Sequence, residues 1–133
     1  METSKVKILI VEDDKDLCDL LYDIIKEEGF IVHKAYDGDI AINGMIRYVY
    51  DIMIVDNRLN NMTGISVIEQ SKVINPRLKT IMLSAYGNTP TKLRARDLGV
   101  YDFIDKPFDV NFLIRRVKEL VDMPYNYASL IYS

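Results

Sequence analysis

The sequence predicts an α/β domain in which helices cover both faces of a five-stranded parallel sheet. The first observation is that short apolar runs rich in β-branched residues recur along the chain, at Val6–Val11, Ile31–Lys34, Ile52–Val55, Thr80–Leu83 and Val100–Ile104. The second is that stretches of helical period lie between and after these runs. Such β-α units in series favour parallel strands joined by right-handed crossovers, with helices on both faces. We therefore expect a doubly wound (βα)5 fold.

The apolar pattern of each strand indicates whether it lies in the centre of the sheet. The sequences ILIV, at the end of the first run, and IMIV, in the third, are continuously apolar. Strands buried on both faces have this character, whereas strands with one solvated face alternate. We therefore predict that the first and third strands are central.

The first helix has the clearest amphipathic pattern. Its apolar residues recur with spacing i, i+3, i+4, i+7 and i+8, at Leu17, Leu20, Leu21, Ile24 and Ile25. Asp14 is expected to cap its N-terminus, and Gly29 to follow its C-terminus. Cys18 lies close to the apolar stripe, and we interpret it as a small core residue.

The other helices are predicted from weaker stripes, at Ile42–Val49, Ile65–Val73, Leu93–Leu98 and Val110–Leu120. The stripe of the second helix includes Ile46 and Val49. Gly99 is expected to close the fourth helix, and Asp109 to cap the N-terminus of the fifth. With these segments the chain completes five β-α units.

Composition excludes several classes of protein. The chain has 133 residues, 49% hydrophobic and 28% charged, which is typical of one globular domain. Its net charge of −3 offers no support for nucleic-acid binding, and we expect none. The single cysteine excludes an intramolecular disulfide and fits a reducing compartment. No apolar run approaches the ~18 residues of a membrane span, so we expect a cytoplasmic protein without membrane insertion.

The last ten residues, 124–133 (PYNYASLIYS), differ from the rest because they contain three tyrosines and no charge. We assign residues 1–123 to the domain and 124–133 to a C-terminal tail. The tail is expected either to pack on the domain or a partner, or to be disordered. The sequence leaves open whether the chain is a stand-alone protein or part of a longer one.

Polar residues follow four of the five predicted strands. Glu12, Asp13 and Asp14 come after the first, Asp56 after the third, Ser84 after the fourth, and Lys106-Pro107 after the fifth. Ligands of open α/β sheets bind at the carboxyl ends of the strands. If the first and third strands are neighbours, Glu12, Asp13 and Asp56 share one pocket. Carboxylates so close together repel one another, and a divalent cation or a lysine relieves that repulsion.

This set of groups suits a phosphoryl group. A few carboxylates, carbonyls and waters form the ligand set that Mg²⁺ prefers. Lys106 can add an ammonium group and Ser84 a hydroxyl, while an aspartate serves as the nucleophile and the other groups neutralise charge. Each residue alone has an ordinary explanation, such as a helix cap or a surface charge. Only their joint placement at successive strand ends indicates a site.

Four motifs carry a family resemblance, namely KILIVEDD, DIMIVDNRLNNMTG, IMLSAYG and YDFIDKPF, at the ends of four predicted strands. Between about Lys5 and Val121 the chain resembles the response-regulator receiver domains of two-component signalling, the CheY-like family. The resemblance implies the strand order 2-1-3-4-5. It also implies a phosphorylation-activated signalling switch rather than an enzyme, because such a domain promotes only its own phosphorylation and dephosphorylation.

Carried over by position, the resemblance implies that Asp56 is the phosphoacceptor. Asp13, Asp56 and the backbone carbonyl of Arg58 would bind Mg²⁺, with Glu12 acting through water. The phosphoryl group would come from a phosphohistidine on a sensor histidine kinase or a histidine phosphotransfer protein.

The same resemblance assigns the response to phosphorylation. Ser84 and Lys106 would contact the phosphoryl group, and Pro107 matches the family's cis-proline. Phe103 matches its switch aromatic, which turns inward when Ser84 moves. The output would be a change in the surface formed by the fourth helix, the fifth strand and the fifth helix. That surface would bind a downstream protein or a second copy of the chain.

Four positions depart from the family's pattern or vary within it. Leu59-Asn60 replaces the usual Met-Pro, so we expect a less rigid loop after the acceptor. Arg58 and Tyr86 occupy positions that influence how quickly the phosphoryl group is lost, and its lifetime is left open.

Other functions remain as alternatives. A receiver-like adaptor that is never phosphorylated would use the same fold. A Mg²⁺-dependent phosphohydrolase would need an acid where this chain has Arg58, and a flavin mononucleotide carrier would need a phosphate loop where it has EDDKD. His33 is the only histidine and has no second histidine beside it for a metal, so we interpret it as structural.

Overall fold

The computed structural model describes residues 5–85 and 89–123, in which five strands alternate with five helices. In chain order these are β1 (Lys7–Val11), α1 (Lys15–Glu27), β2 (Ile31–Ala35), α2 (Gly38–Arg47), β3 (Ile52–Asp56), α3 (Gly64–Ile74), β4 (Lys79–Ser84), α4 (Thr89–Asp97), β5 (Asp102–Asp105) and α5 (Val110–Asp122). Tyr86 and the 124–133 tail lie outside these described ranges. None of the helices within them is long and apolar enough to cross a membrane.

All five strands are parallel, in the order β2-β1-β3-β4-β5, which confirms the predicted fold and topology. The register pairs Val11 with Val55, Asp56 with Leu83, and Ser84 with Asp105. Because neighbouring strands end at the same level, the residues that follow β1, β3, β4 and β5 meet at one edge of the sheet.

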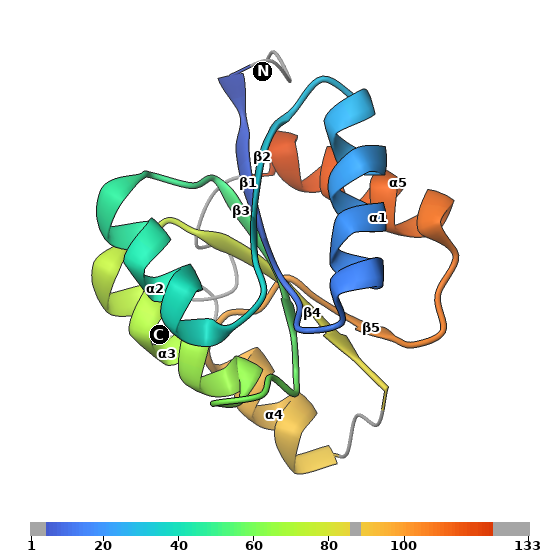
Figure 1. Cartoon of the computed structure of the whole chain (residues 1–133). Coiled ribbons are helices and arrows are strands. Elements are labelled where there is room, and N and C mark those ends of the chain that lie inside the picture. Colours follow the sequence, from blue (N-terminus) through green and yellow to red (C-terminus); the bar gives the residue numbers. More distant parts are fainter. Residues whose placement is uncertain (1–4, 86–88, 124–133) are drawn as a thin grey trace.

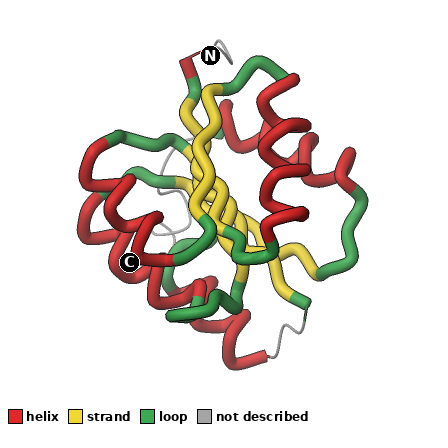
Figure 2. Tube along the Cα trace, in the orientation of Figure 1, coloured by secondary structure: helices red, strands yellow, loops and turns green. Residues whose placement is uncertain are grey.

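Two layers of helices enclose the sheet, with α1 and α5 on one face and α2, α3 and α4 on the other (Figures 1 and 2). Alternate side chains of each strand supply the two cores. Ile8 and Ile10 of β1 point toward the first face, and Leu9 and Val11 toward the second. Every residue of β3 is buried, as the apolar run IMIV predicted.

The helix caps agree with the sequence. The side chains of Asp14 and Asp109 accept hydrogen bonds from backbone amides in the first turns of α1 and α5. Gly29 adopts φ 97° after α1, and Gly99 adopts φ 79° after α4. Left-handed values of this kind favour glycine, so these two positions end their helices as expected.

The fifth strand begins at Asp102, so the predicted start at Val100 is wrong. The Val100 amide donates to the Ala95 carbonyl and the Gly99 amide to Arg96, with N···O distances of 3.0 and 2.9 Å. The Val100 backbone therefore belongs to the C-terminal end of α4, and β-sheet pairing starts only after this residue.

The predicted apolar stripe of the second helix is also partly wrong. α2 buries Gly38, Ala41 and Met45. Ile46 is instead 68% exposed, and Val49 lies beyond the end of the helix with 75% exposure. The helix starts early because the Asp37 side chain accepts from the Ile40 amide, and it packs through small residues rather than through its large apolar ones.

Candidate functional site

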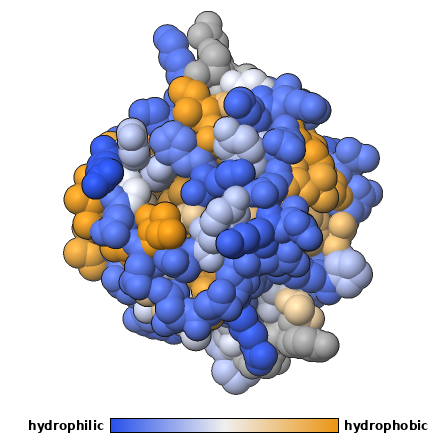
Figure 3. Space-filling view, viewed as in Figure 1, coloured by the Kyte–Doolittle hydropathy of each residue, from blue (hydrophilic) through white to orange (hydrophobic). Residues whose placement is uncertain are grey.

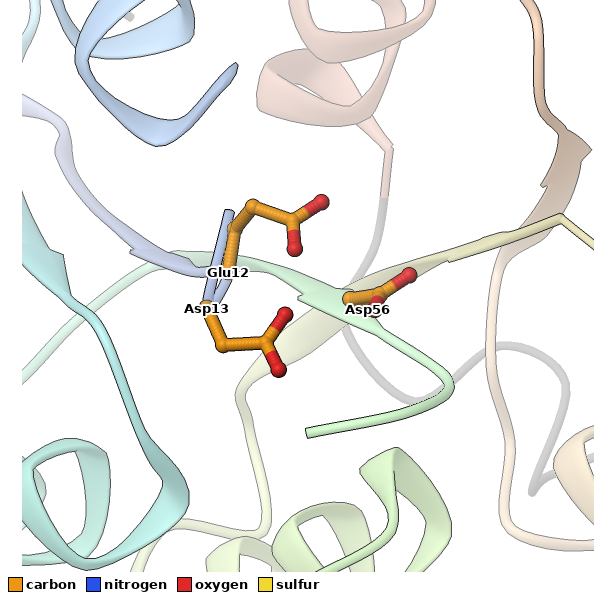
Figure 4. Close-up of side chains that lie close together, drawn as sticks. All are labelled: Glu12, Asp13 and Asp56. Carbon is orange, nitrogen blue, oxygen red and sulfur yellow. The ribbon is translucent and has the colours of Figure 1, made fainter. Parts of the chain in front are cut away.

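Three carboxylates converge at the carboxyl edge of the sheet, where Glu12 and Asp13 follow β1 and Asp56 ends β3 (Figure 4). One oxygen from each lies within 4.8 Å of the others. Glu12 is 1% exposed and Asp56 6%, whereas Asp13 is half-buried. The pairing of Val11 with Val55 explains the convergence, because each carboxylate follows or lies next to this pair.

Lys106 brings a cation to the same place from the end of β5. Its Nζ lies 2.6 Å from Oε1 of Glu12 and 3.0 Å from Oδ1 of Asp56. The Lys106 amide donates to the Ser84 carbonyl at 2.7 Å, which fixes the backbone of this loop beside β4. The Lys106-Pro107 peptide bond is cis, as the resemblance implied.

Burial and mutual repulsion shape the ionisation of the site. Burial raises the pKa of Glu12 and of Asp56, and the neighbouring carboxylates act in the same direction, while Lys106 opposes both effects. Burial by itself would lower the pKa of Lys106, but its hydrogen bonds to Glu12 and Asp56 outweigh this, so the pKa is raised. One ammonium facing three carboxylates leaves an excess of negative charge that suits a bound cation.

Ser84, the last residue of β4, is only 1% exposed, and its Oγ has no hydrogen-bond partner among the described residues. A buried hydroxyl without a partner is costly, and such groups in folded proteins usually face a ligand or a water. A cavity of about 60 Å³ opens beside it, lined by Asp56, Asn57, Arg58, Ser84, Ala85 and Lys106. This is more than the roughly 10–15 Å³ that a single water requires.

The loop after Asp56 is held at several points. Asn57 donates from its amide to the Leu83 carbonyl at 2.7 Å, and its own carbonyl accepts from the Gly64 amide at 2.8 Å. Arg58 and Thr63 form an antiparallel bridge across the loop. The Arg58 amide also hydrogen-bonds the Asp56 carboxylate, which lowers the pKa of that group against the effect of burial.

Gly64 permits this loop to pack closely. A Cβ at this position would lie 2.3 Å from the Asp56 carbonyl oxygen and 3.0 Å from the Asn57 Cα. Only a residue without a side chain therefore allows the N-terminus of α3 to approach the end of β3 so tightly. Nothing in the sequence alone distinguishes Gly64, because this contact is formed only when β3 and α3 are in place.

The structure brings together Glu12, Asp13, Asp56, Ser84 and Lys106, as the sequence predicted. Phe103 lies apart from them in β5, half-buried against the second core, with Nζ of Lys92 5.2 Å from its ring centroid. Sequence reasoning missed Lys92, since only the packing of α4 against β5 places it there, and also Ala85 in the cavity wall. The roles of Phe103 as a switch and of the Arg58 carbonyl as a metal ligand remain predictions.

A doubly wound sheet with carboxylates, a lysine and an unpartnered serine at one edge defines a class of α/β proteins suited to binding a cation with a small anion. The family model of the response regulator receiver domain matches residues 8–118. The chain belongs to this family.

Known structures agree in fold. A receiver domain protein described as CheY-like from Methanospirillum hungatei has a TM-score of 0.85 and 26% identity, covering 88% of this chain and 94% of that one. The response regulator TrrA of Thermotoga maritima, solved in complex with Mg²⁺-BeF, has a TM-score of 0.77 and 26% identity, covering 86% and 98%.

Curated relatives include proteins of different lengths. Sporulation initiation phosphotransferase F of Bacillus subtilis is 28% identical, with 90% of this chain and 97% of the relative aligned. The transcriptional regulatory protein DltR of Streptococcus agalactiae is 29% identical, with 85% of this chain aligned. The chain spans about half the length of DltR, 50%.

Proposed function

We propose that this protein is a phosphorylation-activated signalling switch that accepts a phosphoryl group from a phosphohistidine donor onto Asp56. The observation that carries the proposal is the position of Asp56, which faces a small cavity together with Lys106 and the unpartnered hydroxyl of Ser84. In this reaction an Asp56 oxygen attacks the phosphorus, the P–N bond to the donor imidazole breaks, and an aspartyl phosphate forms.

The other residues of the site bind and neutralise the transferred group. Lys106, already 3.0 Å from Asp56, pairs with a phosphoryl oxygen, and Ser84 donates its free hydroxyl to another. Mg²⁺ would be held by Asp13, Asp56 and the Arg58 carbonyl, with Glu12 acting through water, and would supply further neutralisation of charge. The carboxylate cluster, which has more negative charge than Lys106 can balance, supports this assignment.

The response is proposed to pass from Ser84 to Phe103. Met82 of β4 pairs with Phe103 of β5, so a shift of β4 acts directly on the strand that carries the aromatic ring. A hollow of about 340 Å³ lies beside this strand, lined by residues that include Lys92, Ala95 and Phe103. Space of this kind allows the ring to change position, which would alter the surface of α4, β5 and α5.

The donor is proposed to be a sensor histidine kinase or a histidine phosphotransfer protein. An apolar hollow of about 710 Å³ opens beside Lys106, lined by Leu17, Leu20, Pro107 and Phe108 among others. Leu20 is 49% exposed although it lies on the helix nearest the site. This surface is suitable for contact with a protein that delivers its phosphohistidine to Asp56.

The downstream partner is proposed to be a protein, or a second copy of the chain, that binds the α4–β5–α5 surface. Direct contact with nucleic acid is not proposed, because the net charge of −3 offers no support for it. Action in the cytoplasm follows from the proposed donors.

The chemistry is tested by the intact mass of the protein after incubation with acetyl phosphate, with and without Mg²⁺. We expect a gain of one phosphoryl group that requires both Mg²⁺ and Asp56, and that is lost in Asp56→Asn. Asp51→Asn is the matched control, because Asp51 is an exposed aspartate at the opposite end of β3. An undiminished gain in Asp56→Asn would refute the acceptor assignment.

The donor surface is tested separately with Leu20→Asp. Phosphorylation by acetyl phosphate should be unchanged, whereas transfer from a phosphorylated histidine phosphotransfer protein should slow by about tenfold or more, since a carboxylate would enter the apolar contact. Ile40→Asp on α2, where the side chain is 50% exposed, is the control. Equal slowing in both variants would count against this surface.

A further inference from the structure

Apolar side chains gather at the edge of the molecule opposite the acidic site. Ile46 and Val49, at the end of α2, are 68% and 75% exposed, and Val73 and Ile74, at the end of α3, are 85% and 38% exposed. Figure 3 shows apolar surface on the side where Figure 1 places these two helix ends. We refer to the four residues as the α2–α3 patch. Single exposed apolar residues are ordinary, but a group of them indicates a surface that binds something.

Both halves of the patch adjoin Tyr50, which is buried between them. A Cβ at Gly44 of α2 would lie 3.5 Å from the Tyr50 hydroxyl, so the ring packs against this helix. The Tyr50 carbonyl accepts a hydrogen bond of 3.0 Å from Nδ2 of Asn75, the C-cap of α3. The ends of α2 and α3 are therefore held at the same place, and the patch forms one surface.

The last described residues of the chain lie at the same edge of the sheet as the patch, although α5 packs on the other face. Lys79, the first residue of β4, is buried, and its ammonium group donates to the carbonyls of Leu120 and Met123 at the end of α5. A cation at this position interacts favourably with the carbonyls at the C-terminus of the helix. The Lys79 amide donates to the Asp51 carbonyl, the neighbour of Tyr50, at 3.1 Å. The chain thus leaves α5 at the same edge of the sheet as the patch.

We propose that residues 124–133 of this chain bind to the α2–α3 patch. Their sequence, PYNYASLIYS, combines large apolar and aromatic residues with no charge, so it matches a surface that offers apolar contact. An extended segment of this length spans up to roughly 33 Å, which gives it ample reach from Met123.

A second copy of the chain fits the patch less well. Four partly exposed aliphatic side chains present on the order of a few hundred Å². A standard interface buries about 800 Å² on each partner. The patch has the right extent for a short segment, and because it lies opposite Asp56, a segment bound there leaves the acidic site open.

The test is a double-mutant cycle in the full chain. Leu130→Asp and Val73→Asp should each lower the midpoint of thermal unfolding by roughly 3–5 °C, because each places a carboxylate in the apolar contact. The double variant should be little worse than either single one, since the same contact is lost in each case. Ile40→Asp, at the other end of α2, is the matched control, and its effect should add to that of Leu130→Asp.

Hydrogen–deuterium exchange supplies a second measurement on the same variants. Leu130→Asp should speed amide exchange severalfold at the C-terminal ends of α2 and α3, and leave α1 unchanged. Additive midpoints for Leu130→Asp and Val73→Asp, or unaltered exchange at both helix ends, would overturn the proposal. So would a concentration-dependent dimer that Val73→Asp abolishes and Leu130→Asp does not, which would identify a second copy as the occupant.

Discussion

Two helices flank the acidic site, and they are packed to very different extents. α1 follows β1 and buries Cys18, Leu21 and Ile25 against the sheet. α4 follows β4, and among its described side chains only Ala95 is buried. The site therefore lies between a firmly packed helix on one side and a loosely packed helix on the other.

This difference indicates where a change at the site can be expressed. Segments with few buried apolar contacts open at low free energy, whereas core elements open only with global unfolding. A phosphoryl group on Asp56 would draw Ser84 toward it at the end of β4, next to α4. Because α1 resists displacement, the response should be directed to α4 and β5, in agreement with the surface proposed for output.

The largest expected effect is the loss of core packing under α1. Leu21→Ala should lower the free energy of unfolding by about 2–5 kcal/mol, because Leu21 is 0% exposed and its removal leaves a cavity. Leu93→Ala on α4 is the matched change, and should cost less than about 1 kcal/mol because Leu93 is 49% exposed. Urea denaturation measures both. Similar losses would show that α4 is packed as firmly as α1.

The next effect concerns the tight approach of α3 to the end of β3. Gly64→Ala should destabilise the protein by about 1–3 kcal/mol, because the added Cβ meets backbone at 2.3 Å. It should also slow phosphorylation by acetyl phosphate, since Asp56 and Asn57 must shift. Gly44→Ala in α2 is the control: its nearest contact is 3.5 Å, and alanine should stabilise the helix by roughly 0.5–1 kcal/mol. Stabilisation by Gly64→Ala would contradict the strain inferred there.

The acidic site could be predicted from the sequence because its residues directly follow predicted strands, and the carboxyl ends of parallel strands meet at one edge of the sheet. Continuous apolar runs predicted that the first and third strands are central, and the strand order implied by the family resemblance made them neighbours. Glu12, Asp13 and Asp56 then had to meet. The individual contacts could not be predicted. That Lys106 lies closer to Glu12, at 2.6 Å, than to Asp56, at 3.0 Å, depends on how the loop after β5 is folded.

The sequence was less informative for α2 and α3. A stripe of large apolar residues normally indicates the buried face of a helix, yet Ile46 and Val73 are exposed while Gly38 and Ala41 are buried. The apolar pattern predicts that these side chains are buried, but it does not identify the surface that buries them. If the 124–133 segment binds the α2–α3 patch, the pattern and the structure agree.

A smaller effect is expected in local opening of the two helices. Amides of α4 should exchange with deuterium about tenfold faster, or more, than amides of α1, which corresponds to a difference of about 1.4 kcal/mol in opening. Addition of Mg²⁺ and beryllofluoride, a stable mimic of the phosphoryl group, should change exchange in α4 and β5 more than in α1. A change confined to α1 would reverse the inferred direction of the response.

The smallest effect tests what fixes β5 on its other side. Asp102 of β5 is paired with Arg116 of α5, and both side chains are largely covered, at 24% and 28% exposure. Their coupling energy in a double-mutant cycle with alanine should be about 0.5–1 kcal/mol. Lys118 and Glu28 form the comparison pair, 3.3 Å apart and more exposed at 50% and 32%.

The more exposed pair, Lys118 and Glu28, should have a coupling energy close to zero, because solvent screens exposed charges. On the α4 side, Nζ of Lys92 lies 3.7 Å from Oδ2 of Asp105, with both side chains exposed at 46% and 64%, and 5.2 Å from the ring centroid of Phe103. A β5 that is anchored to α5 by a covered ion pair, and to α4 by a more exposed and therefore weaker one, allows Phe103 to move while the strand keeps its place. Coupling between Asp102 and Arg116 no larger than that of the exposed pair would remove this anchor, and β5 would then be expected to shift together with the ring.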